Sequence, residues 1–451
     1  MVAKKDTIAA IATPPGQGGI GIVRVTGPLV GDISRSITGL NLTPRHAHFC
    51  SFLSGDQQAI DQGIAILFKG PSSYTGEDML ELHGHGGRVV LELVLQRLIE
   101  LGARLAMPGE FTERAFLNGK LDLLQAEAVA DLINSTSAQA ARGAMQSLEG
   151  VFSSHVFDLY NNLKNLRVQI EGSLDFPEEE TGCLDVSVLK SQLQSYIGDV
   201  STMVTKSTQG RRLCEGAYLV IIGRPNVGKS SLLNQLTSRE SAIVSDVSGT
   251  TRDVISENIL IKGTPVIVVD TAGLRETGDA LEREGVRRAH VEIGKADFVL
   301  LVTEVDEDPA AATQDITGQL PDGAGLIIIR NKIDLVDTEP HIEIGSNNIP
   351  EIFLSALTGA GLEYLLKLLS RQILEIENSE DIILARDRHI TALNRTRGCL
   401  EQCLQHLNGD KNPELLAEEL RQAQKALDEI IGATTTEFLL GEIFSRFCIG
   451  K

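Results

Sequence analysis

Short apolar runs separated by polar, glycine-containing segments occupy the middle of the chain. Four of these runs are rich in β-branched residues and have the length of buried parallel strands. They cover residues 217–222, 265–269, 326–329 and 352–354. A helix is expected to begin near Lys229, soon after the first run. The pattern predicts an α/β domain over residues 215–372 whose strands end in polar loops.

Helical periodicity dominates both flanks of this domain. Apolar residues recur at helical spacing over about 121–214, and a second helical block covers about 374–447. An acidic loop at 177–182 interrupts the first block. Because insertions are tolerated where the inserted ends lie close together, we expect the α/β domain to sit in a loop of a helical domain. Helices from both flanks would then pack into one bundle.

The first part of the chain has an α/β pattern of its own. The expected elements are strands at 6–12, 21–25 and 60–68 and an amphipathic helix at 87–101. The intervening stretch 73–87 is so polar and rich in glycine that we do not expect it in the core. It contains His83 and His85, which alternate along one strand. Since no third ligand stands near them, a structural or binding role is favoured over a metal site.

The 451 residues are enough for two to four domains, and the patterns divide them into four segments. These are an N-terminal α/β domain (1–118), a first helical part (119–214), the central α/β domain (215–372) and a second helical part (373–451).

Composition narrows the class of protein. A net charge of −20 argues against broad affinity for nucleic acid, so any RNA contact must use a local basic patch. Six scattered cysteines suit a reducing compartment; Cys399 and Cys403 lie four residues apart, but no further ligands stand near them and a metal site is not expected. No signal peptide or membrane-length apolar run is found, so we expect a cytoplasmic protein without membrane contact.

The first strand leads directly into a phosphate-binding loop. Residues 223–230 read G-R-P-N-V-G-K-S and fit the pattern G-x-x-x-x-G-K-[ST]. Backbone N–H groups of such a loop and the N-terminus of the following helix surround an anion. Lys229 would reach the β- and γ-phosphates, and the Ser230 hydroxyl would ligate Mg²⁺.

Two later motifs distinguish a GTPase from an ATPase. D-T-A-G at 270–273 follows a strand, so that Asp270 can hold the metal through water and the Gly273 amide can meet the γ-phosphate. N-K-I-D at 331–334 follows another, and the Asp334 carboxylate can accept from both N–H donors on the edge of guanine, a pair that adenine lacks. S-A-L at 355–357 is expected to back the base. The three ordered motifs predict a P-loop GTPase of the translation-factor-related class.

Two departures from Ras-like GTPases indicate a different catalytic device. Leu274 stands where Ras-like enzymes carry the glutamine that orients the attacking water. Asn226 in the loop and the segment 245–253 resemble the elements of a cation-dependent GTPase, in which K⁺ replaces an arginine finger. Glu282 is selected by resemblance to orient the water. A plain loop residue at Asn226 and a solvated acidic helix start around Glu282 remain the alternatives.

The ligand assignments at this site follow from these motifs. The residues predicted to bind GTP are Asn226, Val227, Gly228, Lys229, Ser230, Ser231, Ser245, Asp246, Val247, Ser248, Gly249, Thr250, Thr251, Asp270, Thr271, Ala272, Gly273, Asn331, Lys332, Asp334, Ser355 and Ala356. The predicted Mg²⁺ ligands are Ser230 and Thr251, and the predicted K⁺ ligands are Asn226, Ser245, Val247 and Thr250.

Nearly the whole chain resembles the MnmE (TrmE) family of tRNA-modification GTPases. The resemblance rests on T-P-P-G-x-G-G-x-G-I-x-R, S-Y-T-G-E-D, H-G-H-G-G, P-G-E-F-T-E-R-A-F-L-N-G-K, G-T-T-R-D, D-T-A-G-L-R-E, N-K-I-D and the terminal F-C-I-G-K. It implies an N-terminal domain that forms a homodimer and binds 5-formyl-tetrahydrofolate or a related one-carbon folate. The implied folate ligands are Arg24, Glu81, Lys120 and Lys451. Cys448 is the implied reactive thiol, although nothing local favours its thiolate.

The resemblance also implies a reaction and its partners. The chain would act with an FAD-binding partner, MnmG, as a heterotetramer, and add an aminomethyl-type group at C5 of the wobble uridine of certain tRNAs. The flavin belongs to the partner, because this chain has no flavin motif. Meeting of two GTPase domains across a K⁺-containing interface would activate hydrolysis. Candidate tRNA contacts are Arg386, Arg388, Arg395 and Arg397, for which a solvated helix face is the alternative.

Two rival functions share the GTPase motifs. A regulatory or ribosome-assembly GTPase would lack the folate-like N-terminal region and the F-C-I-G-K end, and the chain carries no G-x-x-G loop of a KH unit. An interaction scaffold with an inactive GTPase would not be expected to keep all the catalytic-site residues found here, which are Lys229, Ser230, Thr251 and Asp270.

Overall fold

The computed structural model forms two compact units. Unit 1 comprises residues 1–133, 145–201 and 391–451, and unit 2 comprises 134–144 and 202–390. The structure describes residues 6–135, 137–175, 186–239, 255–261, 264–270, 291–321, 324–336, 338–345, 348–374, 383–408, 413–432, 437–445, 447 and 450. Within the described part of the chain, no helix is both long and apolar enough to span a lipid bilayer.

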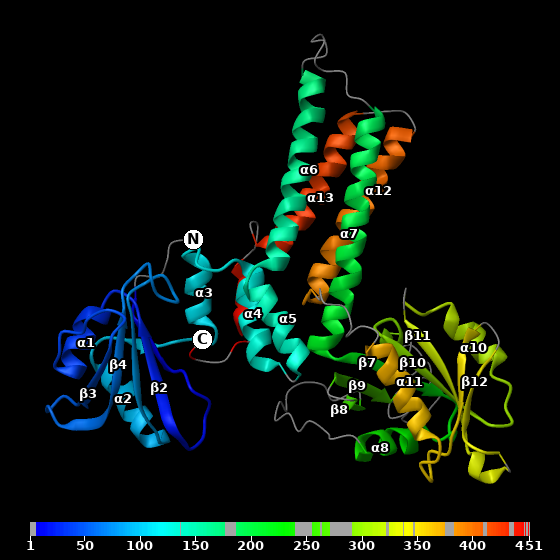
Figure 1. Cartoon of the computed structure of the whole chain (residues 1–451), viewed down its shortest axis with the longest axis horizontal. Helices are drawn as coiled ribbons and strands as arrows, with labels where there is room; N and C mark the ends of the chain where they lie inside the picture. Colours follow the sequence, from blue (N-terminus) through cyan, green and yellow to red (C-terminus); the bar gives the residue numbers. More distant parts are fainter. Residues whose placement is uncertain are drawn as a thin grey trace, which may run out of the picture. The chain divides into compact units, whose positions relative to one another are not determined.

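Unit 1 begins with a six-stranded sheet in the order β3-β4-β5-β2-β1-β6 (Figure 1). The strands are β1 Ile8–Ile11, β2 Gly18–Thr26, β3 Ala47–Leu53, β4 Ala59–Phe68, β5 Met79–Gly86 and β6 Arg104–Leu105. Helices α1 Val30–Thr38 and α2 Arg88–Glu100 pack against the sheet, and their apolar side chains join one buried core with it. The expected strands at 6–12, 21–25 and 60–68 and the helix at 87–101 are confirmed within a few residues.

The expectation that the stretch 73–87 stays out of the core is wrong for its second half. β5 lies between β4 and β2, and Leu80 and Leu82 are 0% and 1% exposed in the core. Alternate residues of a strand point to opposite faces, so Glu81 and His83 occupy the other face. The segment is therefore a strand with one apolar, buried face and one polar face. Its average composition is polar and does not indicate the buried face.

Helices from both sides of the central α/β domain pack together, and most of their residues belong to unit 1. The first flank contributes α3 Glu110–Leu117, α4 Leu123–Asn134, α5 Ala138–Leu148, α6 Val151–Asp175 and α7 Val186–Glu215, and the second contributes α12 Asp387–Asn408, α13 Pro413–Ile431 and α14 Glu437–Ser445. α6 packs along α13, and α3 contacts α14. Leu123 and Ala126 share a buried cluster with Leu440 and Phe444. This arrangement confirms the predicted fold class, a helical domain interrupted by an α/β domain.

Unit 2 contains a seven-stranded sheet in the order β12-β13-β11-β10-β7-β9-β8. The strands are β7 Ala217–Gly223, β8 Ile255–Ile261, β9 Thr264–Asp270, β10 Phe298–Glu304, β11 Gly325–Asn331, β12 His341–Ile344 and β13 Pro350–Phe353, and the helices include α8 Lys229–Arg239, α10 Ala310–Thr317, η3 Ile333–Leu335 and α11 Leu362–Leu374. The five central strands of this sheet, in the order β13-β11-β10-β7-β9, are parallel to one another. The loops after parallel strands meet at one edge of a sheet. The phosphate-binding loop, Asp270 and the N-K-I-D motif therefore gather at one edge.

Candidate functional site

The loop between β7 and α8 is shaped for close backbone approach. Gly228 has a φ of +101°, and a Cβ at this position would lie 2.2 Å from Nδ2 of Asn331. Only glycine fits there. Asn226 also adopts a positive φ, of 64°, which Asn tolerates better than most residues. The tight loop thus depends on both residues.

The ammonium group of Lys229 lies against its own loop. Its Nζ donates to the carbonyl oxygens of Gly223 at 2.9 Å and Arg224 at 2.6 Å, and the residue is 5% exposed. Ser230 and Ser231 follow in the first turn of α8 and are exposed. A buried cation within a glycine-containing loop at a helix N-terminus fits an anionic polyphosphate.

Asn331 ties three loops of this edge together. Its Nδ2 donates to the carbonyl oxygen of Val227 at 2.6 Å, and its Oδ1 accepts from the backbone N–H of Ala356 at 2.8 Å. The side chain is buried, and so are both of these hydrogen bonds. Ser355 is also buried, and its Oγ accepts from the N–H of Thr358 at 3.2 Å. The Asn331 amide therefore fixes the S-A-L loop and the phosphate-binding loop relative to each other.

Of the other residues of the N-K-I-D motif, Ile333 is buried, Lys332 is partly exposed and Asp334 is exposed. Lys332 adopts a φ of 69° and its Nζ lies 2.5 Å from Oε1 of Glu304. Asp334, on η3, is exposed and available to a ligand. A second acidic residue of the loop after β10, Glu307, forms an ion pair with Arg224 of the phosphate-binding loop. Neither glutamate could be predicted from the local sequence, because the partner of each lies on another loop.

Several predicted ligands lie outside the described residues. These are Ser245, Asp246, Val247, Ser248, Gly249, Thr250, Thr251, Thr271, Ala272, Gly273, Glu282, Cys448 and Lys451. The backbone of Asp270 closes β9, whereas its side chain belongs to the same excluded set.

A second site lies on the sheet of unit 1 and centres on Arg24 and Glu81. These residues face each other on β2 and β5, and Nε and Nη2 of Arg24 lie 2.9 and 2.8 Å from Oε1 of Glu81. The other carboxylate oxygen, Oε2, lies 3.1 Å from Nε2 of His83. Nη1 of Arg24 donates to the carbonyl oxygen of Gly450 at 3.3 Å. Gly450 is thus held next to this pair.

Beside this pair opens a pocket of about 450 Å³. It is lined by Arg45, Phe68, Ser72, Ser73, Tyr74, Met79, Glu81 and Lys120. Two predicted folate ligands, Glu81 and Lys120, therefore share one cavity. The Tyr74 ring lies 5.6 Å from the Arg24 guanidinium, its hydroxyl lies 2.9 Å from Oγ1 of Thr112, and burial raises the pKa of its phenol. Arg45 and Tyr74 were not predicted, because nothing in their local sequence marks them as ligands.

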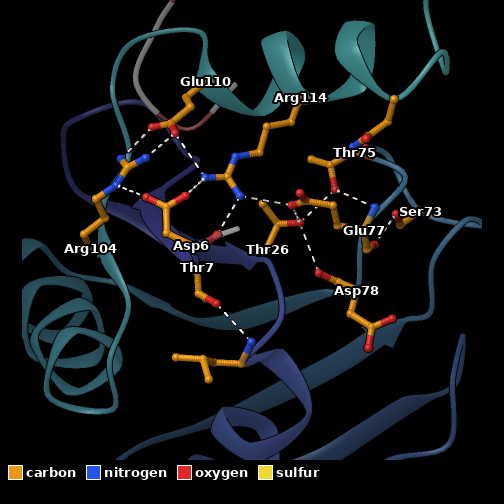
Figure 2. A network of polar contacts seen from close by, with 12 residues as sticks. Asp6, Thr7, Thr26, Ser73, Thr75, Glu77, Asp78, Arg104, Glu110 and Arg114 are labelled. Carbon is orange, nitrogen blue, oxygen red and sulfur yellow. Dashed lines mark hydrogen bonds and ion pairs between the residues drawn. The ribbon is translucent and has the colours of Figure 1, made fainter. Parts of the chain in front are cut away.

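A buried ionic network supports the loop that carries Tyr74 (Figure 2). Arg114 is 5% exposed in its side chain and contacts three carboxylates, those of Asp6 at 2.7 Å, Glu77 at 3.1 Å and Glu110 at 3.1 Å. Burial by itself raises the pKa of Glu110, but hydrogen bonds from Arg104, the Met107 N–H and Arg114 outweigh it and hold this pKa below its ordinary value. The network connects the start of β1, the S-Y-T-G-E-D loop and α3.

The loop is also tied to the chain near Lys120. Nδ2 of Asn118 donates to the carbonyl oxygen of Thr75 at 2.7 Å. Two sequence motifs, S-Y-T-G-E-D and P-G-E-F-T-E-R-A-F-L-N-G-K, thus interlock around the pocket. Their polar residues have structural partners here, which their sequence alone did not reveal.

Comparison with known proteins identifies the family. A model of the MnmE helical domain matches residues 123–448, and a model of the N-terminus of the GTP-binding protein TrmE matches residues 7–120. The chain belongs to the MnmE family of tRNA modification GTPases. The tRNA modification GTPase MnmE of Pseudomonas paraeruginosa (strain DSM 24068 / PA7) is 50% identical over 455 residues, which cover 100% of each chain. The protein of that name from Proteus mirabilis (strain HI4320) is 49% identical over 99% of each chain.

A solved structure, the G domain of the FeoB iron transporter of T. maritima, aligns with 36% of this chain and 99% of its own at 25% identity and a TM-score of 0.26. The assignment of unit 2 as the GTPase domain of an MnmE-family protein rests on its parallel sheet, its phosphate-binding loop and family membership.

The remaining candidates do not form a further site. His83 and His85 contact different carboxylates, Glu81 and Asp61, and among the described residues no group of three metal-ligating side chains is found. Burial raises the pKa of Cys399 to about 11 and that of Cys403 to about 12, so both thiols stay protonated at neutral pH.

The arginines considered as tRNA contacts have acidic or other polar partners. Arg395 pairs with Glu429, and Arg397 lies 3.9 Å from Glu401. Arg386 and Arg388 also have polar or electrostatic interactions. These contacts favour the solvated helix face over a dedicated tRNA surface.

Proposed function

We propose that this MnmE-family GTPase acts with the FAD-binding protein MnmG to add a (carboxymethyl)aminomethyl group at C5 of the wobble uridine of certain tRNAs. Full-length similarity to proteins named tRNA modification GTPase MnmE supports the substrate class. GTP binding by unit 2 is supported mainly by the buried Asn331 amide, which forms hydrogen bonds with both the phosphate-binding loop and the S-A-L loop. This arrangement suits a guanine nucleotide with its phosphates at one loop and its base at the other.

GTP hydrolysis is the proposed reaction of unit 2. Water attacks the γ-phosphorus, the bond to the β–γ bridging oxygen breaks, and GDP and inorganic phosphate leave. Lys229 would bind the β- and γ-phosphates, Asp334 the guanine edge, and Glu282 would orient the water. The buried position of Lys229 at the carbonyls of its loop supports its role.

Two cations belong to the proposal. Ser230 and Thr251 would ligate Mg²⁺, with Asp270 acting through water, and Asn226, Ser245, Val247 and Thr250 would hold K⁺. The positive φ of Asn226 in the phosphate-binding loop supports a special role for this residue. K⁺ would supply the positive charge that an arginine finger supplies in other GTPases, upon dimerisation of the GTPase domains.

The pocket of unit 1 is the proposed folate site. Glu81 would accept from pterin N–H groups, and Lys120, Arg24 and Lys451 would contribute positive charge for 5-formyl-tetrahydrofolate or a related one-carbon folate. The contact of Arg24 with Gly450 supports this, because Gly450 precedes Lys451 and follows Cys448 by two residues. Folate would supply the one-carbon unit, and the flavin of the partner the redox chemistry.

The assembly follows from the same assignment. Residues 1–118 would form the homodimer and folate domain, 119–214 and 373–451 the helical domain, and 215–372 the GTPase domain. Two copies would bind MnmG as a heterotetramer, which acts on tRNA in the cytoplasm.

Two measurements on the full chain test the proposal. Hydrolysis should be faster in K⁺ than in Na⁺ at equal ionic strength, and Asn226→Ala should abolish the difference; equal rates in both salts would exclude the cation-dependent mechanism. Cys448→Ser should keep GTP hydrolysis and lose tRNA modification in the presence of MnmG. If it keeps both, the thiol has no part in the chemistry.

A further inference from the structure

Strand β7 of unit 2 holds more than the phosphate-binding loop at its end. Its residue Ile221 pairs with Asp270 of β9, the first residue of the D-T-A-G motif. Three positions earlier on β7, Tyr218 contacts the segment 292–297, which leads into β10. The D-T-A-G motif therefore begins a stretch of chain, 270–292, whose two ends both meet β7.

Each of the three polar groups of Tyr218 has a partner in the segment 292–297. The backbone N–H donates to Oδ2 of Asp297 at 2.9 Å, and the carbonyl oxygen accepts from the N–H of Asp297 at 2.9 Å. The hydroxyl donates to Oε2 of Glu292. Burial, together with the carboxylate of Glu292, raises the pKa of the Tyr218 phenol, so the hydroxyl stays protonated and acts as the donor.

Glu292 is fixed against the sheet by polar and apolar contacts. The residue is 7% exposed, and its other carboxylate oxygen, Oε1, accepts from Nζ of Lys295 at 2.9 Å. Ile293, the next residue, is 4% exposed and belongs to the same buried cluster as Val220 of β7. A buried carboxylate depends on such hydrogen bonds, because leaving it unpaired is costly. The Lys295 side chain is 58% exposed, so Tyr218, on the sheet, is the more rigid of the two partners.

We propose that Tyr218 is a positioning residue for GTP hydrolysis, which anchors through Glu292 the far end of the stretch that begins with D-T-A-G. The near end is fixed by the pairing of Asp270 with Ile221. A stretch of chain with both ends fixed samples fewer conformations, so less entropy is lost when its residues are placed around the γ-phosphate. The inference rests on the proposed role of this stretch in hydrolysis, in which Glu282 orients the water.

Steady-state GTP hydrolysis by the full chain separates positioning from nucleotide binding. Tyr218→Phe keeps the ring and the backbone contacts and removes only the hydroxyl. Tyr218 precedes Gly223 on β7 by about 17 Å of strand, so the change lies away from the phosphate-binding loop. We therefore expect kcat to fall about 5- to 20-fold and KM to change less than about twofold. Unchanged kcat in Tyr218→Phe would overturn the inference.

A double-mutant cycle tests whether Tyr218 and Glu292 act as one contact. Glu292→Ala should lower kcat as Tyr218→Phe does, and the double variant should lose no more than Glu292→Ala alone. Glu292→Gln keeps an oxygen that accepts from the hydroxyl, and its kcat should stay within about twofold of the wild-type value. Additive losses in the double variant, or a loss in Glu292→Gln as large as in Glu292→Ala, would contradict the proposed hydrogen bond.

Controls separate this role from a purely structural one. Tyr364→Phe is the matched variant, because Tyr364 on α11 packs against the other face of the same sheet, and its kcat should equal that of the wild type. A lowered midpoint of urea unfolding in Tyr218→Phe with unchanged kcat would make the contact structural only. Glu282→Ala tests the proposed function separately: wild-type hydrolysis there would exclude the role of Glu282. Loss in Glu282→Ala with full activity in Tyr218→Phe would contradict the positioning role alone.

Discussion

The side-chain amide of Asn331 donates to the carbonyl oxygen of Val227 at 2.6 Å, although the two residues are 104 positions apart in the chain. The contact joins the end of β11 to the phosphate-binding loop. Because Asn331 also accepts from Ala356, one buried amide links the segments expected to contact the phosphates and the base of a nucleotide.

Asn331→Ala should therefore weaken nucleotide binding, because it removes the link between these two loops. The change leaves the Val227 oxygen and the Ala356 N–H buried without partners, at a cost of about 1–3 kcal/mol. We expect affinity for a fluorescent GDP analogue to fall about 10- to 100-fold. Thr358→Ala, which removes an exposed hydroxyl contact in the same loop, is the matched control and should bind normally. Unchanged affinity in Asn331→Ala would show that the linkage is not needed.

Gly450→Ala should disturb the contact of Gly450 with Arg24 beside the unit 1 pocket. Gly450 has a φ of +96°, and a Cβ there would lie 2.5 Å from the carbonyl oxygen of Ile11, a backbone atom that cannot move aside easily. With MnmG present, we expect tRNA modification to fall at least about tenfold while GTP hydrolysis stays near the wild-type rate. Gly441→Ala is the control, because a Cβ at Gly441 meets nothing within 4 Å. Parallel loss of both activities would mean that Gly450 serves the GTPase instead.

Asp297→Asn should destabilise unit 2. The residue is 3% exposed, and its carboxylate accepts from Arg211 at 2.6 Å, Arg212 at 2.8 Å and the N–H of Tyr218 at 2.9 Å. An amide removes the buried negative charge shared by the two guanidinium groups, of which, among the described residues, only Arg211 keeps another carboxylate, Asp387 at 3.5 Å, so the expected cost is about 3 kcal/mol. The midpoint of urea unfolding of the full chain should fall accordingly. Asp308→Asn replaces an exposed carboxylate that accepts from Ala310, a bond that an amide oxygen keeps, and should leave the midpoint in place.

The ionic network behind the pocket predicts a pH dependence. The pKa of Glu110 is lowered from 4.5 in the folded chain, so its ionised form stabilises unit 1 above about pH 4.5. This contribution is lost as the pH falls below 4.5 through the lowered pKa, because the protonated carboxyl gives up its ion pairs. The stability difference between wild type and Glu110→Gln should therefore be constant near neutrality and shrink in acid. Glu363→Gln, on an exposed position of α11, should show no such trend.

Local patterns were sufficient for much of the fold. The four apolar runs correspond to β7, β9, β11 and β13. They can be recognised in the sequence because a run of apolar, β-branched residues is a local signal for a strand. The nucleotide-binding motifs can also be recognised in the sequence, because each is a short run of consecutive residues. The same patterns are misleading at β5: its polar residues predict a segment outside the core, although Leu80 and Leu82 are buried.

By itself, the sequence determined the order of the motifs, the interruption of a helical domain by an α/β domain and the residue types able to bind a guanine nucleotide. Tertiary structure decided which charges meet. Arg24 bonds to Glu81 across 57 positions and to Gly450 across 426, and Arg45 reaches the same pocket from another loop. Such pairs depend on strand register and on the packing of distant helices, which no local run of residues encodes.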